Sequence, residues 1–277
     1  MKNILVPTDF SDYAVNALNF AIEISRINQT KVYVIHVLEY PVGGTVDPVG
    51  MFVPTPSDKG FVQLLSKNAD LKMEEFCKDV KEECEAAVQI GNPYPTIIET
   101  IEEKNIDLVI MGTKGASGLK EVFIGSNAER VVRFAKCPVI TTNSPVNFRN
   151  IKSIAFAIDI NNTPDRVFVK LKELQTLFDA KLHLVHINTP NDFERDQLSL
   201  RYLRSIVKDQ QMTNIEIHVF NDYYTEDGIF SFAEHYGTDL IAMTTHGRRG
   251  LSHLVSGSLA EDVVNHAKRP VWTCRVG

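Results

Sequence analysis

The sequence predicts an α/β protein made of two tandem Rossmann-like domains, each an open five-stranded parallel sheet with helices on both faces. Short runs rich in Val and Ile alternate with amphipathic stretches, which is typical of buried parallel strands joined by crossover helices. This alternation occurs twice within the 277 residues. A glycine-bearing segment that starts at Met111 nearly recurs from Met243, which indicates a duplicated module.

The duplication can be measured as the number of residues that separates equivalent positions in the two copies. Asp9 recurs 150 residues later as Asp159, whereas Pro138 recurs only 132 residues later. The register therefore drops by 18 residues between the second and third strands of the module. We place the first domain at residues 1–143 and the second at residues 151–277, each close to the roughly 140 residues of a usual domain.

Apolar runs define the strands of each copy. In the first copy the predicted strands are Ile4–Thr8, Lys31–Leu38, Ala86–Ile90, Asp107–Met111 and Pro138–Thr142. The amphipathic stretches between them predict helices at Asp12–Ile27, Lys59–Lys81, Tyr94–Lys104 and Asn127–Lys136. In the second copy the predicted strands are Ile154–Ile158, Leu182–Ile187, Ile215–Phe220, Asp239–Thr244 and Val271–Cys274.

An insertion rich in Pro and Gly, Glu39–Gly60, accounts for the change in register. Because proline and glycine interrupt regular backbone hydrogen bonding, we expect no regular structure there. The insertion follows the second strand, so it lies at the end of the sheet where ligands bind. Two roles remain open for it, a lid over the site or a surface loop.

Composition excludes several function classes. A net charge of −6 and a pI near 5.8 provide no basic surface for a nucleic-acid backbone. No apolar run reaches the roughly 18 residues of a membrane helix, and no basic-then-apolar leader precedes the first strand. The 4 cysteines are too sparse for a zinc knuckle or a secreted disulfide framework. We therefore expect a cytoplasmic protein that binds neither nucleic acid nor membrane.

The candidate site is expected at the carboxyl ends of the strands, where ligands collect when the strand order reverses. Asp9 ends the first strand and Gly112 ends the fourth. If these two strands are neighbours, the carboxylate and the glycine loop share one crevice. The alternative for Asp9 is a purely local role, as the cap or turn residue of the helix that begins at Asp12.

The segment after the fourth strand has the chemistry of an anion-binding turn. Ser126 and Glu129 have the spacing of a capping box, which leaves the amides of Asn127 and Ala128 directed at a ligand on the positive end of the helix dipole. Glycines along this segment can adopt positive φ and admit a phosphate close to the backbone. Lys114 adds a cation. The alternative is that these residues serve only turn geometry and helix capping.

These residues resemble a known family. The pattern Gly112-x-x-Gly115, nine residues, Gly125-Ser126 is similar to the nucleotide-binding signature of the ATP-binding universal stress proteins. The family's first strand, its Gly-x-Pro turn and its last strand have counterparts in Ile4–Asp9, Gly91-Asn92-Pro93 and Cys137-Pro138-Val139. The resemblance extends over nearly the whole chain as two tandem domains.

The resemblance implies an adenine nucleotide α-hydrolase-like fold that binds ATP, or ADP or AMP, with or without Mg²⁺. By family analogy Asp9 contacts the nucleoside, the backbone near Val37 frames adenine, and the loop after the fourth strand holds the phosphates. The nucleotide-binding residues implied are Pro7, Thr8, Asp9, Val37, Met111, Gly112, Lys114, Gly115, Gly125, Ser126 and Asn127. The resemblance also implies that Pro138–Thr142 pairs with Val271–Cys274 across the domain interface, with a homodimer as a further option.

The second copy departs from the signature. Thr244 stands where the first copy has Gly112, and we expect a β-branched residue to resist positive φ and to crowd the phosphate. Tyr223-Tyr224-Thr225 replaces the Gly-x-Pro turn. A weaker second site is therefore predicted, with the residues Asp159, Gly247, Gly257 and Ser258.

Seven of the 8 histidines fall in the second copy. A metal site is one interpretation, but His183 and His186 point to opposite faces of a strand and no His pair has helical i, i+4 spacing. We therefore assign no metal ligand. Three functions stay open: a nucleotide-dependent regulatory or stress-response module, a slow ATP hydrolase for which no catalytic residue is assigned, and a nucleotide-independent interaction scaffold.

Overall fold

The computed structural model describes residues 1–39, 43–46, 52–55, 59–113, 125–160, 162–245 and 259–276. The first copy contains β1 (Asn3–Pro7), α1 (Asp12–Asn28), β2 (Lys31–Leu38), β3 (Gly43–Val46), β4 (Phe52–Thr55), α2 (Lys59–Phe76), η1 (Lys78–Val80), β5 (Cys84–Ile90), α3 (Pro93–Glu103), β6 (Leu108–Gly112), α4 (Ser126–Phe134) and β7 (Val139–Thr142). The second copy contains η2 (Phe148–Asn150), β8 (Ser153–Ala157), α5 (Asp165–Phe178), β9 (Lys181–Asn188), α6 (Asp196–Asp209), β10 (Ile215–Asn221), α7 (Thr225–His235), β11 (Leu240–Thr245), α8 (Leu259–His266) and β12 (Val271–Arg275).

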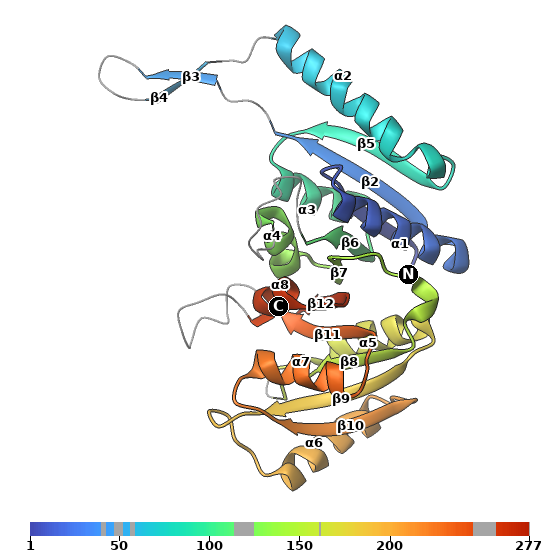
Figure 1. Ribbon diagram of the computed structural model, residues 1–277, viewed down its shortest axis with the longest axis vertical. Coiled ribbons are helices and arrows are strands. Elements are labelled where there is room, and N and C mark those ends of the chain that lie inside the picture. The colour runs from blue at the N-terminus through green and yellow to red at the C-terminus, as the bar shows by residue number, and fades with distance from the viewer. Residues whose placement is uncertain are drawn as a thin grey trace.

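Ten strands form one continuous sheet that runs through both copies (Figure 1). The strand order is β10-β9-β8-β11-β12-β7-β6-β1-β2-β5, and each half follows the same order of connection. In the first half β1 pairs in parallel with both β2 and β6. The strand order therefore reverses between β1 and β6. This confirms the expected adjacency of the two strands that end near Asp9 and at Gly112.

Two layers of helices cover the sheet. The buried side chains of α1, α2, α5 and α6 belong to one apolar cluster, and those of α3, α4, α7 and α8 belong to another. Each cluster extends over both copies, so the two halves share their packing as well as their sheet. The predicted α/β class with helices on both faces is confirmed.

The two copies are joined by their last strands. β7 pairs antiparallel with β12, with Ile140 opposite Trp272, and this is the pairing implied by the resemblance. The linker is also fixed in place, because the amide of Phe148 donates to Glu23 Oε2 at 2.7 Å and the Phe148 ring lies 5.1 Å from the ring of Phe178. The junction is therefore a packed interface and not a loose tether.

The insertion contradicts one expectation. Within Glu39–Gly60, β3 and β4 form an antiparallel two-stranded sheet, with Gly43 opposite Thr55 and Val46 opposite Phe52. A two-stranded ribbon has no central strand, so Pro54 is tolerated where a central strand would exclude it. The short runs of β-forming residues between the prolines were therefore sufficient for pairing. The proposed lid lies partly outside the described residues.

An aspartate ahead of the fourth strand fixes the start of the first strand in both copies. Asp107 Oδ2 accepts from the amides of Lys2 at 2.6 Å and Asn3 at 3.1 Å. Asp239 does the same for Lys152 and Ser153, each at 2.9 Å. The repeat therefore conserves a small structural device as well as its strands.

We expect Asp107→Ala to lower the free energy of unfolding by about 1 kcal/mol at neutral pH, because the carboxyl is only partly buried. Burial acts to raise the pKa of Asp107, but the amides of Lys2 and Asn3 outweigh it and leave the pKa below the usual value. A lowered folded pKa means that the contribution is complete above the unfolded pKa and is lost as the pH falls through the folded pKa. Urea unfolding at neutral and acidic pH checks this, and an equal deficit at both would contradict it.

Candidate functional site

A cavity of about 500 Å³ opens at the carboxyl ends of β1, β2 and β6. Its remaining walls come from the first residues of α1, α3 and α4. Nine of the residues predicted from the sequence line it together: Pro7, Thr8, Asp9, Val37, Met111, Gly112, Gly125, Ser126 and Asn127. Lys114 and Gly115 lie outside the described residues. The reversal of strand order thus places the predicted residues around one space.

The turn after β1 holds Asp9 at the cavity. Asp9 Oδ1 accepts from the amide of Ser11 at 3.1 Å, and the amide of Phe10 donates to Thr8 Oγ1 at 2.9 Å. Phe10 has a φ of 65°, a left-handed conformation that costs a non-glycine residue about 1–2 kcal/mol and is common at ligand sites. The helix cap is Ser11, whose side chain accepts from the amide of Ala14. Asp9 is therefore a turn residue and not the N-cap.

His36 supports this turn from β2. Its Nδ1 lies 2.8 Å from the carbonyl oxygen of Thr8, and its ring lies 4.3 Å from that of Phe10. In the second copy the equivalent His186 bonds to the backbone of Ile158, and burial is the main cause that lowers the pKa of this histidine. The repeated contact indicates that these histidines fix the end of the first strand.

Gly112 is required for a reason other than the expected one. Neither Gly112 nor Gly125 has a positive φ, and among the described glycines only Gly237 does. Instead, a Cβ at residue 112 would lie 2.7 Å from the Cβ of Tyr13 and 2.9 Å from its carbonyl carbon. The glycine therefore permits α1 to begin directly against β6, which closes one side of the cavity.

The start of α4 also corrects an expectation. The helix begins at Ser126 with Gly125 as its N-cap, and no side chain caps it. The predicted capping box of Ser126 and Glu129 is therefore wrong; the Glu129 amide donates to the Gly125 carbonyl at 3.0 Å. The amides of the first turn have no partner inside the helix. Since Ser126 and Asn127 line the cavity, the positive end of α4 remains directed at it.

Several lining residues were missed by the sequence analysis. They come from the strand ends and helix starts that the topology brings together: Ser11, Ala14, Ile35, His36, Leu38, Glu39, Pro93, Ile97 and Thr113. Ala128, whose amide was expected to face a ligand, also lines the cavity. Most of the missed residues could have been found from their position at the ends of the predicted strands, because residues that directly follow parallel strands gather at one edge of the sheet. Pro93 is the first residue of α3, where its missing N–H is tolerated.

The walls of the cavity combine apolar side chains with few charges. Ile35, Ile97 and Met111 are buried and form part of its lining. Asp9 and Glu39 also line it, and no Lys or Arg among the described residues does. Such a space suits a flat apolar group, a hydroxylated group near a carboxylate and an anion at a helix N-terminus.

The second copy builds the corresponding region differently. Asp159 Oδ1 and Oδ2 accept from the backbone and side-chain amides of Asn162 at 3.2 and 3.0 Å. Helix α5 begins at Asp165, three residues later than α1 when the copies are aligned by 150 residues. Thr244 lies in β11 without a positive φ, so the expected backbone strain does not occur at this position. The other predicted residues, Gly247, Gly257 and Ser258, lie outside the described residues.

None of the helices that the structure describes is both long and apolar enough to cross a membrane.

Comparisons with known proteins agree with this architecture. The sequence pattern of the Universal stress protein family matches residues 1–143 and again residues 150–275. A universal stress protein of Methanocaldococcus jannaschii is 36% identical over 151 residues, 52% of this chain and 83% of that protein. One from Synechocystis is 25% identical over 292 residues, 99% of this chain and 100% of that protein.

A solved structure shows the same fold over the full length. The crystal structure of a universal stress protein from Archaeoglobus fulgidus matches with a TM-score of 0.76 at 20% identity, covering 99% of this chain and 98% of that one. The chain thus belongs to the universal stress protein family, with two copies of the family's adenine nucleotide α-hydrolase-like domain in tandem.

Proposed function

We propose that the first domain binds an adenine nucleotide, ATP before ADP or AMP, and that the protein acts as a nucleotide-dependent regulatory module in a stress response. The observation that supports this most strongly is the single cavity that joins Asp9, the end of β2 and the first turn of α4. Its volume of about 500 Å³ lies within the roughly 300–1,000 Å³ usual for small-molecule sites.

Each part of a nucleotide has a matching part of the cavity. The apolar wall near Val37 suits the adenine ring, and the carboxylate of Asp9 suits the ribose hydroxyls. The first-turn amides of α4 suit a phosphate, because they combine donors that have no partner inside the helix with the positive end of the helix dipole. Lys114 and Gly115, which the family resemblance assigns to the phosphate site, lie outside the described residues.

The charge of the cavity favours a nucleotide that carries a cation. Asp9 and Glu39 are the charged side chains among its described lining residues, and both are negative. Bare phosphates would be repelled by them, whereas Mg²⁺ prefers oxygen ligands and neutralises phosphate charge. The carboxylates therefore fit a Mg²⁺–ATP complex, in which the ion would supply charge neutralisation.

Helix α4 connects the proposed site to the second domain. Its last turn contacts that domain through Arg133 Nη1 and Glu261 Oε1, which are 3.5 Å apart, and through Arg275 Nη1, which donates to the Phe134 carbonyl at 3.2 Å. A ligand that shifts the start of α4 would therefore move groups that touch the other half of the molecule. This physical link is the basis for a regulatory role.

We further propose that the two domains divide as residues 1–143, with the intact site, and residues 151–277, with a weakened one. The closing strands β7 and β12 already pair within one chain, so the edge that joins the domains is not available for a second chain. A homodimer would have to use another surface.

Gly125→Val is expected to abolish ATP binding without loss of folding. A Cβ at residue 125 comes no closer than 3.9 Å to the nearest described atom, the Thr113 carbonyl oxygen, so the valine makes no close contact there with the described residues but occupies the space beside the α4 amides. Isothermal titration with Mg²⁺–ATP measures the effect. Gly257→Val, the same change at the equivalent position of the second copy, is the matched control and should leave the tight site intact. Loss of binding only in Gly257→Val would reverse the assignment.

A phosphate-release assay on the purified protein separates regulation from hydrolysis, and we expect no turnover beyond that of free ATP. Mass spectrometry of small molecules released on denaturation provides an independent check. Retained ATP or ADP supports the proposal, whereas a protein that neither retains nor titrates adenine nucleotide would leave the interaction scaffold as the function.

A further inference from the structure

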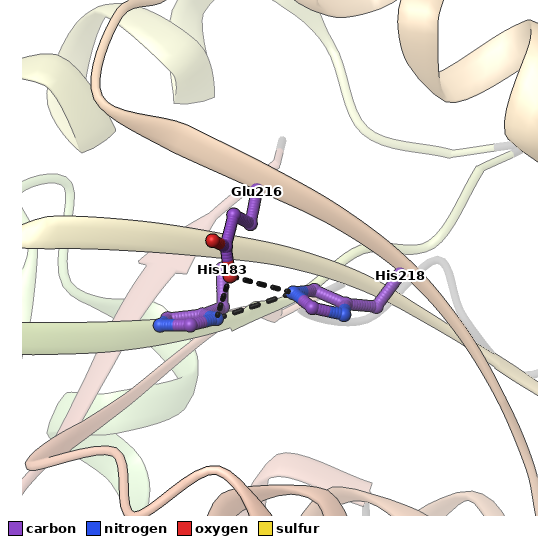
Figure 2. A group of neighbouring side chains, drawn as sticks. All are labelled: His183, Glu216 and His218. Carbon is purple, nitrogen blue, oxygen red and sulfur yellow. Dashed lines mark hydrogen bonds and ion pairs between the residues drawn. The ribbon is translucent and has the colours of Figure 1, made fainter.

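Three side chains on the outer strands of the second domain converge on one point (Figure 2). They are His183 on β9 and Glu216 and His218 on β10. His183 Nδ1 lies 3.2 Å from His218 Nε2 and 3.6 Å from Glu216 Oε2, and His218 Nε2 lies 3.8 Å from the same oxygen. In the part of the chain that the structure describes, this is the one group of His, Cys, Asp or Glu residues with that geometry.

The triangle has nearly the dimensions of a metal site. Zinc binds imidazole nitrogen at about 2.0–2.1 Å and carboxylate oxygen at about 2.0–2.2 Å, so neighbouring ligands of a tetrahedral ion lie roughly 3.3–3.5 Å apart. The three observed separations differ from this range by a few tenths of an ångström. The three donor atoms are therefore already close to the spacing that one ion requires.

Sheet register brings the three residues together. Glu216 is the direct pairing partner of His183, and His218 follows Glu216 by two residues, so all three side chains project from the same face. His183 and His186 lie on opposite faces, as predicted, but the second imidazole comes from the neighbouring strand instead. Ligands on two paired strands are held more precisely than ligands on loops.

The surroundings of the three side chains favour neutral imidazoles and leave one side of the group open to solvent. The ring of Tyr236 lies 4.5 Å from that of His218, and the ring of Phe232 lies 5.1 Å from it. The side chains of His183 and His218 are only 8% and 14% exposed, whereas that of Glu216 is 48% exposed. Burial is the main cause that lowers the pKa of both histidines. Solvent therefore reaches the triangle from the side of the carboxylate.

A lysine positions the carboxylate. Lys181 Nζ lies 2.6 Å from Glu216 Oε1, which leaves the other oxygen directed at the histidines (Figure 2). The lysine charge opposes a nearby cation, but the side chain is 43% exposed and water screens much of the repulsion. The simpler alternative is a hydrogen bond between two neutral imidazoles beside a surface ion pair.

We propose that His183 Nδ1, His218 Nε2 and Glu216 Oε2 bind one divalent transition-metal ion, with zinc as the expected ion and water as the fourth ligand. Two imidazoles and a carboxylate are a common ligand set for zinc, and thiolate-preferring or oxygen-preferring ions are disfavoured. The ion would tie β10, an edge strand of the sheet, to β9. This site lies in the opposite half of the chain from the nucleotide cavity and does not depend on it.

Calorimetric titration of chelator-treated full-length protein with ZnCl₂ tests the proposal, together with the visible spectrum after Co²⁺ addition. We expect one ion per chain, a tetrahedral Co²⁺ spectrum and a higher melting temperature with Zn²⁺. Glu216→Gln and His218→Ala should each weaken binding at least about 100-fold, since loss of an outer-shell partner alone commonly costs 10–100-fold. If His218→Ala fails to fold, Glu216→Gln at its half-exposed position still provides the test.

Two control variants separate a metal site from its alternatives. His266 Nδ1 and Glu226 Oε1 are 2.8 Å apart but have no third ligand among the described residues, so His266→Ala should leave Zn²⁺ binding unchanged. Lys181→Met removes the ion pair but keeps all three ligands, so Zn²⁺ binding should be retained or strengthened. The proposal is overturned if the wild type binds no Zn²⁺ at micromolar concentration. It is equally overturned if Glu216→Gln binds as tightly as the wild type, because the ion would then belong to other residues.

Discussion

Trp272→Ala is expected to lower the free energy of unfolding by about 3–5 kcal/mol, a large part of the roughly 5–15 kcal/mol that stabilises a typical domain. Trp272 is the single tryptophan of the chain and only 1% exposed. It lies in β12 between Ala242 of its own half and Ile140 of the other. Removing the indole opens a cavity where the two halves meet, so both should be affected.

Urea unfolding measures this loss. It is followed by circular dichroism, because the variant lacks the single tryptophan whose fluorescence would otherwise report unfolding. Tyr223→Ala, at a side chain that is 77% exposed, is the aromatic control and should change stability by less than about 0.5 kcal/mol. In the wild type, Trp272 fluorescence and circular dichroism should follow one transition, because the halves share one sheet. Two separate transitions would show that the junction does not couple them.

Gly112→Val is expected to remove ATP binding and to destabilise the fold by about 1–3 kcal/mol, the usual cost of overpacking a tight contact. The new Cβ would lie 2.7 Å from the Cβ of Tyr13 and 2.9 Å from a backbone atom. Backbone cannot rotate away as a flexible side chain can, so the start of α1 must move. Because Asp9 and Ser11 directly precede that start, the cavity loses its shape.

Gly125→Val provides the matched comparison, since it adds the same side chain to the same cavity at a position where the new Cβ would lie 3.9 Å from the nearest described atom, an ordinary van der Waals contact. Both variants should lose Mg²⁺–ATP binding in calorimetry, but only Gly112→Val should lower the urea midpoint. If the two variants were equally stable, the close contact with Tyr13 would not be the reason for glycine at residue 112.

Much of the fold could be predicted because its signals are local. Val- and Ile-rich runs gave the second strand, Lys31–Leu38, with the observed bounds. The spacing of the glycines, of Asp9 and of Pro138 identified the duplication and the family, and the family fold then determined which strands are neighbours. The residues that follow neighbouring parallel strands necessarily meet, which is why nine predicted residues line one cavity.

Features that depend on contacts between residues far apart in the sequence were not predicted. Whether a glycine serves positive φ or close packing depends on its neighbour, and Tyr13 is 99 residues away from Gly112 along the chain. The group formed by His183, Glu216 and His218 depends on the exact register of β9 and β10, which alternation alone does not specify. The β3–β4 ribbon was not predicted because the prolines and glycines of the insertion disfavour regular structure, and its β-forming runs are short.

The pairing of β7 with β12 within one chain affects which amino-acid substitutions each half can accept during evolution. In a symmetric dimer of identical chains, every substitution occurs on both sides of the twofold axis. Here the two sides are encoded separately yet remain permanently assembled, so each can accept substitutions that the other does not share. One half has Gly112 and the cavity beside it, whereas the other has Thr244 and carries His183 and His218 on β9 and the edge strand β10.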